Sequence, residues 1–167
     1  MNLPLPDAEA LVGALVRQLS PRVTPETGII GIFTGGVWLA ERLHRELGLV
    51  LPMGSIDISF YRDDYAKSGL HASVKPSQIP FDVAGRHILL VDDVLYTGRT
   101  VRGALNEIFD YGRPASVSLV VLVDRGGREL PIAPQYFGAT VAVPERSMLV
   151  LSRTEDGILT LQLERDA

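Results

Sequence analysis

Short apolar runs alternate with amphipathic segments through the middle of the chain, and this alternation constrains the fold more than any other feature. The runs at residues 29–33, 87–91 and 116–123 have the length and composition of strands, and the third is apolar enough to be covered on both faces. Between them, apolar residues recur at helical spacing over residues 37–47 and 101–109. Because strand, helix and strand in this order need a right-handed crossover, we predict an α/β fold whose central sheet is mostly parallel and flanked by helices.

The segments on either side of this α/β core have different patterns. Helical spacing predicts a helix over residues 8–19, and alternation predicts a half-buried strand over residues 54–61. The long polar stretch that follows has little periodicity, which is typical of a lid or a binding loop. The end of the chain is rich in β-formers, with short strands expected at residues 136–143, 147–151 and 158–163. We therefore expect a small β-rich C-terminal part.

The composition favours one domain and excludes several kinds of chemistry. With 167 residues the chain has the length of a single compact domain, residues 1–167. It has no cysteine, which excludes disulfides, thiolate catalysis and cysteine-bound metals. The net charge is −4 and only two of the 16 basic residues are lysines, which disfavours broad nucleic-acid binding. No apolar run reaches about 18 residues and no export signal is recognisable, so we expect a cytoplasmic protein without membrane contact.

The most informative segment, residues 88–100, joins a strand to two adjacent carboxylates, a glycine turn and the start of a helix. Asp92 and Asp93 suit ribose hydroxyls, which donate to carboxylates, or a magnesium ion. The N–H groups of residues 96–100 suit a phosphate, because they lie at a helix N-terminus and Gly98 permits a close approach. A pair of aspartates after a strand can also simply cap a turn, but the Thr-Gly-Arg-Thr turn and helix behind this pair favour the sugar-phosphate site.

Two further turns follow predicted strands. They begin at Thr34 and at Asp124. Because the carboxyl ends of parallel strands meet at one edge of a sheet, we expect these turns and the Asp92-Asp93 segment to converge on one ligand. Taken alone, the Thr-Gly-Gly sequence fits a plain tight turn equally well.

Three segments in order resemble the PyrR family of type I phosphoribosyltransferases, namely residues 56–64, 91–100 and 123–131. That family comprises bifunctional uracil phosphoribosyltransferases and pyrimidine-operon attenuators, and the match extends over roughly the whole chain. The resemblance implies the type I phosphoribosyltransferase fold, with a flexible lid at residues 62–80 and a base-covering hood at residues 125–167. It also implies transfer of a phosphoribosyl group from phosphoribosyl pyrophosphate (PRPP) to uracil, which yields UMP and pyrophosphate, in a homodimer or a larger homo-oligomer.

Carried over by position, the resemblance makes Asp92 and Asp93 the catalytic pair that contacts the ribose hydroxyls. Mg²⁺ would be bound with PRPP, and the same two carboxylates are its candidate ligands. The PRPP-binding segment then comprises Val94, Leu95, Tyr96, Thr97, Gly98, Arg99 and Thr100. The residues that would bind pyrophosphate are Thr34, Gly35 and Gly36. In the family, this turn often contains a cis peptide bond before a residue other than proline. The family commonly has a basic residue where this chain has Gly35, so one cation for the pyrophosphate is missing.

The remaining assignments by resemblance fall on the lid and the hood. The lid candidates are Arg62, Asp63 and Lys67, and the candidates beside the base are Asp124, Arg125 and Arg128. Without the resemblance, the lid residues fit a solvated loop and the two hood arginines fit surface ion pairs. Trp38 fits the core or a subunit contact better than a ligand site.

Two other functions are compatible with parts of the pattern. A signalling receiver domain also binds magnesium with paired acids, but it needs a later lysine, and none occurs among the 75 residues after Asp92. A nucleotide-sensing regulator that binds pyr messenger RNA is the stronger alternative. A basic face for RNA would come from the arginines near the first two helices, Arg17, Arg22, Arg42 and Arg45. Since an acidic chain with two lysines offers few phosphate contacts, we expect weak or no RNA binding.

Overall fold

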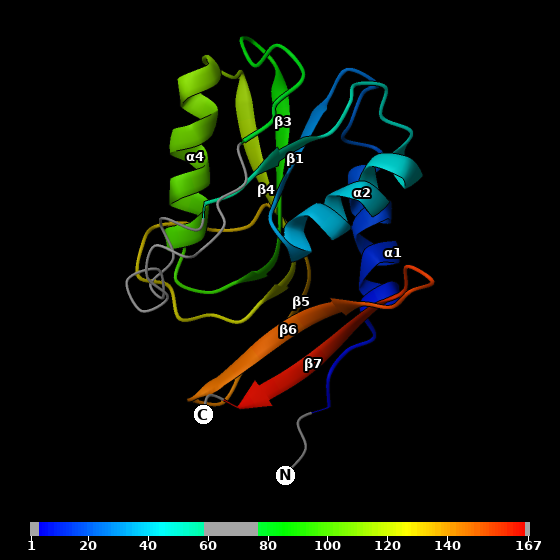
Figure 1. Ribbon diagram of the computed structural model, residues 1–167, viewed down its shortest axis with the longest axis vertical. Coiled ribbons are helices and arrows are strands. Elements are labelled where there is room, and N and C mark those ends of the chain that lie inside the picture. Colours follow the sequence, from blue (N-terminus) through cyan, green and yellow to red (C-terminus); the bar gives the residue numbers. More distant parts are fainter. Residues whose placement is uncertain (1–3, 59–76, 166–167) are drawn as a thin grey trace.

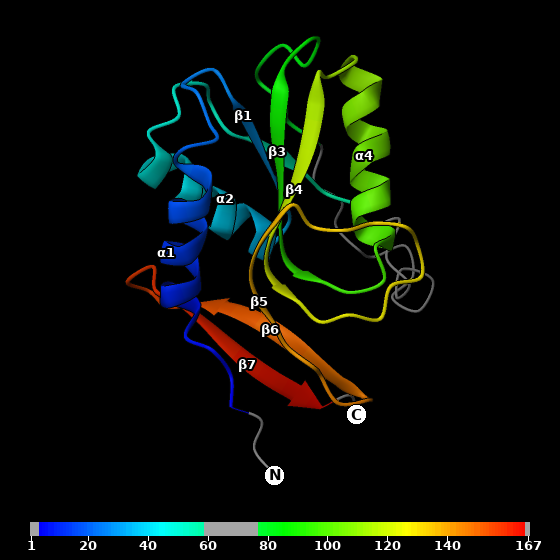
Figure 2. The ribbon, with the colours of Figure 1, turned by 180° about the vertical axis from the view of Figure 1, so that it is seen from behind.

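The computed structural model describes residues 4–58 and 77–165, and these form an α/β architecture (Figure 1). The elements are α1 (Ala8–Leu19), β1 (Gly28–Ile32), α2 (Gly35–Leu47), β2 (Gly54–Ile56), β3 (His87–Leu95), α4 (Arg99–Tyr111), β4 (Ser116–Asp124), β5 (Tyr136–Thr140), β6 (Ser147–Arg153) and β7 (Leu159–Arg165). A parallel sheet in the order β2-β1-β3-β4-β5 has α1 and α2 on one face and α4 on the other. Figure 2 shows the antiparallel pair β6-β7 beside the lower end of this sheet.

The central strands bury both of their faces, as their apolar runs predict. Along β3, Leu89 and Val91 belong to the core under α1 and α2, whereas Ile88 and Leu90 belong to the core under α4. This division follows from the two-residue period of a strand, which sends alternate side chains to opposite faces. The predicted α/β fold with a mostly parallel central sheet is confirmed.

The helices begin and end within two residues of the predicted ranges. Asp7 occupies the N-cap position of α1, although its side chain makes no capping hydrogen bond. α2 ends where Gly48 adopts a left-handed conformation (φ 65°) and donates its N–H to the carbonyls of the last helical turn. Among the described residues, no helix is long and apolar enough to cross a membrane.

The acid pair lies within β3, whereas the apolar run predicts a strand that ends at Val91, just before it. β3 continues to Leu95 because its pairing with β4 persists from Asp92 opposite Val121 to Leu95 opposite Asp124. The aspartates are therefore held by a ladder of backbone hydrogen bonds instead of by a turn. This difference matters for the site, since a strand fixes side-chain direction more tightly than a turn does.

Two other strands also differ from the prediction. β2 ends at Ile56, residues 57–58 are described without strand structure, and residues 59–61 lie outside the described residues. The strand expected over residues 136–143 is β5, and it pairs in parallel with β4 at the edge of the central sheet. The antiparallel C-terminal part is therefore only β6 and β7, because β5 follows a loop that returns the chain to the central sheet.

A cluster of Glu9 in α1, Arg42 in α2 and Leu159 in β7 attaches the β6-β7 pair to the helices. Arg42 donates two hydrogen bonds to the Glu9 carboxylate, at 2.8 and 2.9 Å, and the Leu159 N–H donates to the same carboxylate at 3.0 Å. The hydrogen bonds from Arg42 lower the pKa of Glu9 below its ordinary value, against the opposing effect of burial. β6 is thereby held next to the carboxyl ends of the central strands.

Candidate active site

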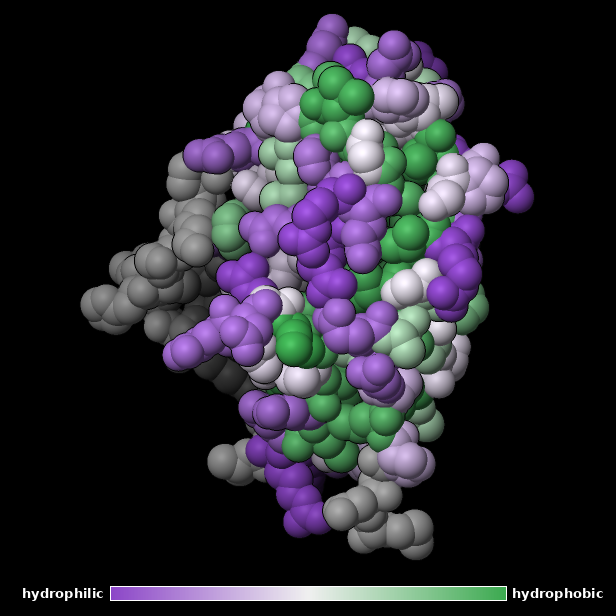
Figure 3. All heavy atoms as spheres, turned by 90° about the vertical axis from the view of Figure 1, so that its right-hand side faces the viewer, coloured by the Kyte–Doolittle hydropathy of each residue, from purple (hydrophilic) through white to green (hydrophobic). Residues whose placement is uncertain are grey.

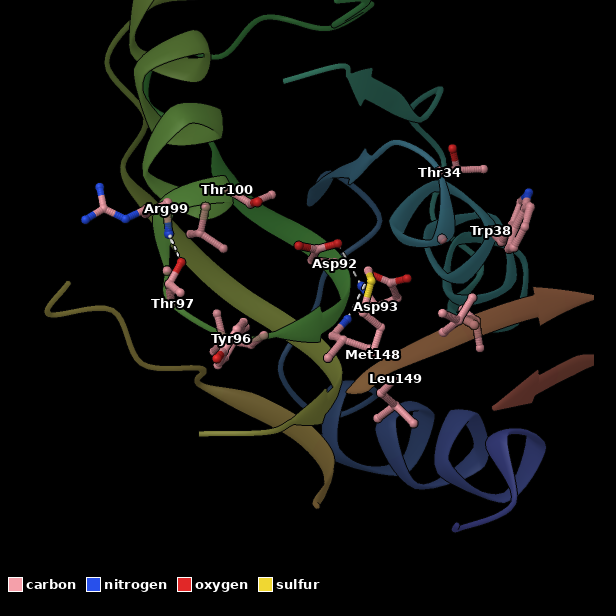
Figure 4. Close-up of a pocket in the computed structure, with 17 residues that line it drawn as sticks. Thr34, Trp38, Asp92, Asp93, Tyr96, Thr97, Arg99, Thr100, Met148 and Leu149 are labelled. Atoms are coloured by element: carbon pink, nitrogen blue, oxygen red, sulfur yellow. Dashed lines mark hydrogen bonds between the residues drawn. The ribbon is translucent and has the colours of Figure 1, made fainter. Parts of the chain in front are cut away.

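A cavity of about 460 Å³ lies at the carboxyl edge of the sheet, and three parts of the chain line it (Figure 4). The start of α2 contributes Thr34, Gly35 and Trp38. The end of β3, the following loop and the first turns of α4 contribute residues 92–101, and β6 contributes residues 148–151. Of the three turns predicted to converge, those after β1 and β3 face the same cavity, whereas the turn that begins at Asp124 does not line it.

Asp92 and Asp93 lie between the start of α2 and the loop that precedes α4 (Figure 4). Asp92 is only 6% exposed, and its Oδ1 accepts the Asp93 N–H at 2.9 Å. The Oδ1 atom of Asp93 accepts the Val94 N–H at 2.8 Å. These short bonds fix both carboxylates against the backbone, so the acid pair is oriented before any ligand binds.

The loop between β3 and α4 has the geometry of a phosphate cradle. Gly98 is the N-cap of α4 and has a left-handed backbone (φ 93°), which a residue with a side chain rarely adopts. The Thr97 hydroxyl accepts the N–H of Arg99 at 3.2 Å, and α4 has no acidic residue in its first turn. The start of α4, which is the positive end of its helix dipole, therefore lines the cavity without a competing carboxylate in that turn.

The turn between β1 and α2 supplies a second helix N-terminus to the same cavity. The peptide bond between Phe33 and Thr34 is cis, as the family resemblance implies. Thr34 and Gly35 line the cavity, and the first turn of α2 contains no acidic residue. Gly36 lies behind them, where an added Cβ would be 2.6 Å from the Val91 carbonyl oxygen, so it lets α2 pack directly on β3.

The space beside Gly35 is filled by Asp93. A Cβ added at Gly35 would collide with the Asp93 carboxylate, and it would lie 2.7 Å from the Cγ atom and 3.0 Å from the Cβ atom of that aspartate. The family's usual basic residue therefore has no room at position 35 of this chain while Asp93 keeps its observed position. A side chain at position 35 and the observed position of Asp93 exclude one another.

The residues predicted beside the base lie behind the loop, and none of them lines the cavity. Arg128 donates to the Asp124 carboxylate at 2.6 Å, and the Arg125 guanidinium lies 3.9 Å from the centre of the Tyr96 ring. Burial raises the pKa of Asp124, but hydrogen bonds from Arg128 and the Gly126 N–H lower it below its ordinary value. Within the described residues, the side chains of Arg125 and Arg128 contact Tyr96 from outside the cavity.

Two parts of the cavity wall were missed in the sequence. Trp38 was expected in the core or a subunit contact, and the structure shows it packed against the core and lining the cavity as well. Residues 148–151 of β6 lie within the expected hood, but no sequence pattern distinguished them, because their position depends on how the β6-β7 pair attaches to α1 and α2.

The predicted lid residues Arg62, Asp63 and Lys67 lie outside the described residues. The end of the lid segment is described, and it contacts the edge of the sheet. Gln78 pairs with Ser55 through two backbone hydrogen bonds of 2.7 and 2.8 Å. The predicted lid therefore returns to the sheet at Gln78, two residues before its expected end.

Comparison with known proteins identifies the family of the chain. A family model described as a phosphoribosyl transferase domain matches residues 5–145. A protein named bifunctional protein PyrR from Pseudomonas fluorescens is 49% identical over 98% of this chain and 96% of its own length. A protein of the same name from Ralstonia nicotianae is 54% identical over 90% of this chain and 88% of its own length.

Solved structures share the fold. A purine phosphoribosyltransferase from Pyrococcus horikoshii has a TM-score of 0.62 and 26% identity, over 80% of this chain and 82% of that one. A hypoxanthine phosphoribosyltransferase from Staphylococcus aureus has a TM-score of 0.66 at 20% identity, over 89% and 81% of the two chains. The chain therefore belongs to the phosphoribosyltransferases with the type I fold and, among them, to the PyrR family.

Proposed function

We propose that this protein is a uracil phosphoribosyltransferase of the PyrR type, which forms UMP and pyrophosphate from uracil and PRPP. The observation that carries the proposal is one cavity in which a fixed pair of carboxylates lies between two helix N-termini. PRPP has the matching arrangement, since its ribose hydroxyls lie between a 5-phosphate and a pyrophosphate. Hydroxyls donate to carboxylates, and phosphates accept from N–H groups at helix N-termini.

The parts of PRPP are assigned to the residues that match them chemically. Asp92 and Asp93 receive the ribose hydroxyls, residues 97–100 hold the 5-phosphate, and Thr34 with Gly35 holds the pyrophosphate. Cations for the pyrophosphate would come from Arg62 and Lys67 of the lid, because position 35 supplies none. Closing the lid would also exclude water, which strengthens every electrostatic interaction in the cavity.

The acid pair suits Mg²⁺ only as a partial site. No cluster of three or more metal-ligating side chains occurs in residues 4–58 and 77–165, whereas Mg²⁺ is often held by one or two carboxylates together with phosphates and water. We therefore propose that Asp92 and Asp93 hold the ion together with PRPP. When bound, it would neutralise charge on the departing pyrophosphate.

The base would be bound by the backbone edge of β6 that faces away from β7. In an antiparallel pair, successive residues alternately face the partner strand and point outwards. The Leu159 N–H donates to a carboxylate of α1 and the Ser147 carbonyl accepts from an arginine side chain, so both residues point outwards. By the same alternation, Leu149 and Leu151 point their N–H and C=O groups away from β7, and both line the cavity. Uracil carries adjacent N–H and C=O groups, which match a donor and an acceptor on a strand edge.

The reaction needs no protein nucleophile. A uracil ring nitrogen forms a bond to the anomeric carbon while the bond to pyrophosphate breaks, through an oxocarbenium-like transition state. The ring nitrogen loses its proton, for which Asp93 is the proposed acceptor. Holding both reactants in line and stabilising the leaving group with helix N-termini supply the catalysis.

The test is UMP formation from uracil and PRPP with Mg²⁺, in a panel that includes orotate, hypoxanthine and guanine. Asp93→Asn keeps the shape of the side chain and is expected to lower kcat by about 10² to 10⁴-fold, without changing the urea midpoint of unfolding. Absence of UMP at every salt and magnesium concentration would overturn the proposal and leave a non-catalytic nucleotide sensor.

For the second function of the PyrR proteins, we propose that transcript binding is weak or absent. Among the arginines of the α1 and α2 face, Arg42 is paired with Glu9 at 2.8 Å and with Glu46 at 3.9 Å, so its charge is largely compensated. Figure 3 shows hydrophilic and hydrophobic side chains intermixed on this face. Tight binding of a pyr leader transcript that weakens steeply with added salt would contradict the proposal.

A further inference from the structure

Residues 124–132, with the sequence Asp-Arg-Gly-Gly-Arg-Glu-Leu-Pro-Ile, contact residues 96–100, here called the phosphate loop, and none of residues 124–132 lines the cavity. We infer that it is a brace that presets the phosphate loop, and that Arg128 is its central positioning residue. The inference rests on the proposed function, because it assumes that residues 97–100 hold the 5-phosphate of PRPP.

Arg128 uses three nitrogen atoms to connect parts of this region. Its Nη1 atom donates to the Tyr96 carbonyl at 2.8 Å, and its Nε atom donates to the Ile132 carbonyl at 2.9 Å. Its Nη2 atom donates to the Asp124 carboxylate at 2.6 Å, which anchors the guanidinium at the end of β4. A planar guanidinium fixed at three points can hold the Tyr96 carbonyl in one direction.

The backbone of the brace bonds to the next carbonyl along the loop. The N–H groups of Glu129 and Leu130 both donate to the Thr97 carbonyl, at 2.9 and 3.2 Å. Two consecutive carbonyls of the phosphate loop, those of Tyr96 and Thr97, are therefore held on the brace side.

These carbonyl bonds determine where the phosphate-binding N–H groups point. In a planar trans peptide the C=O of one residue and the N–H of the next point in opposite directions. Holding the Tyr96 carbonyl outwards turns the Thr97 N–H towards the cavity, and holding the Thr97 carbonyl outwards turns the Gly98 N–H the same way. The donors are thus oriented before phosphate binds, which lowers the cost of ordering them on binding.

Close packing between the brace and the loop supports the same role. Gly127 has a left-handed backbone (φ 77°), and a Cβ added there would lie 2.8 Å from the Cδ1 atom of Tyr96. On the next part of the loop, a Cβ added at Gly98 would lie 3.0 Å from the Cγ1 atom of Ile132. Glycines at both positions let the two segments approach closely enough for the carbonyl bonds to form.

The test compares Arg128→Ala with Arg86→Ala. Arg86 is a matched control, because it also donates to two backbone carbonyls, those of Asp82 at 2.6 Å and Glu26 at 2.7 Å, but neither carbonyl belongs to the phosphate loop. Isothermal titration calorimetry would measure binding of ribose 5-phosphate, which probes the phosphate loop, and of inorganic pyrophosphate, which probes the start of α2.

Arg128→Ala is expected to weaken ribose 5-phosphate binding roughly tenfold, because a charged hydrogen bond that orients the donors is lost. Pyrophosphate binding and the KM for uracil should stay at wild-type values, and the KM for PRPP should rise. Millimolar guanidinium should partly restore ribose 5-phosphate binding to the Arg128→Ala protein. Arg86→Ala should bind ribose 5-phosphate like the wild type, even where its urea midpoint falls as far as that of Arg128→Ala.

Unchanged ribose 5-phosphate binding in Arg128→Ala would overturn the brace, as would a selective rise in the KM for uracil, which would place Arg128 beside the base instead. An equal loss in both variants would also overturn it, because the effect would then follow stability alone. If the wild-type protein binds neither ribose 5-phosphate nor PRPP, the proposed function itself fails, and this outcome is distinct from the others.

Discussion

Replacing Gly35 by alanine is expected to displace Asp93 and thereby to impair catalysis more than folding. The added methyl group would lie 2.7 Å from the Cγ atom and 3.0 Å from the Cβ atom of Asp93, both well inside van der Waals contact. The side chain of Asp93 must then rotate away, which removes the 2.8 Å hydrogen bond from the Val94 N–H.

The magnitude follows from two opposing contributions. Overpacking typically costs about 1 to 3 kcal/mol, whereas alanine in a helix is favoured over glycine by up to about 1 kcal/mol. With the full helix gain, the net destabilisation is about 0 to 2 kcal/mol. A displacement of about 1 Å at a catalytic group can cost about 10²-fold in rate, so kcat for UMP formation should fall by roughly that factor.

Gly13→Ala in α1 is the matched control, because the only described atom close to an added Cβ is the Arg17 Nη1 atom at 3.4 Å. It should raise stability by about 0.5 to 1 kcal/mol and leave kcat unchanged. Urea unfolding can be followed by the fluorescence of Trp38, the single tryptophan, and kcat by UMP formation.

Wild-type kcat in the Gly35→Ala protein would refute this reasoning. A second variant in the same experiment, Gly35→Arg, introduces the basic residue that the family commonly has at this position. Gly35→Arg meets the same obstruction at its Cβ atom, so it should lose activity instead of gaining affinity for pyrophosphate.

Three further predictions concern stability and the loop. The hydrogen bonds from Arg42 lower the pKa of Glu9 in the folded protein, so the stabilisation they give is present above the unfolded-state pKa and is lost as the pH falls through the folded-state pKa. Glu9→Gln should therefore remove this part of the acid dependence of the urea midpoint. An unchanged acid dependence would contradict the assignment. Gly98→Ala should raise the KM for PRPP, because the backbone is left-handed and the new Cβ would lie 3.0 Å from Ile132; a wild-type KM would argue against it. Leu122→Ala, at a fully buried position in β4, should lower the free energy of unfolding by about 2 to 5 kcal/mol in urea titrations, and a loss under about 1 kcal/mol would mean that the core collapses around the cavity.

Much of the fold and half of the site could be predicted because the evidence is local in the sequence. Apolar runs and helical spacing mark β1, α2, β3, α4 and β4, and each pattern depends only on neighbouring residues. The carboxylates and the phosphate loop are contiguous within residues 92–100, and the rule that parallel strands end at the same edge added the turn at Thr34. The same rule also added the turn at Asp124, which does not line the cavity.

The end of β3 and the position of β5 could not be predicted in the same way. Asp92 and Asp93 interrupt the apolar run, so the local pattern predicts that the strand ends before them. In the folded protein, backbone pairing with β4, which is a long-range interaction, extends β3 to Leu95. Likewise, residues 136–140 have the same composition whether they pair with β4 or with β6. The register from Val120 opposite Tyr136 to Asp124 opposite Thr140 settles the choice.

The sequence by itself determined the chemistry of this protein, namely an acid pair, a phosphate turn and the order of strands and helices. Only the tertiary structure decided which groups surround that chemistry. The β6 wall reaches the cavity because Glu9 contacts Arg42 and the backbone of Leu159, 150 residues away in the chain. The Asp124 to Ile132 segment lies behind the phosphate loop because Arg128 bonds to the Tyr96 carbonyl, 32 residues before it. Contacts between distant residues leave no periodic pattern in the sequence, which is the physical reason that they emerge only when the chain is folded.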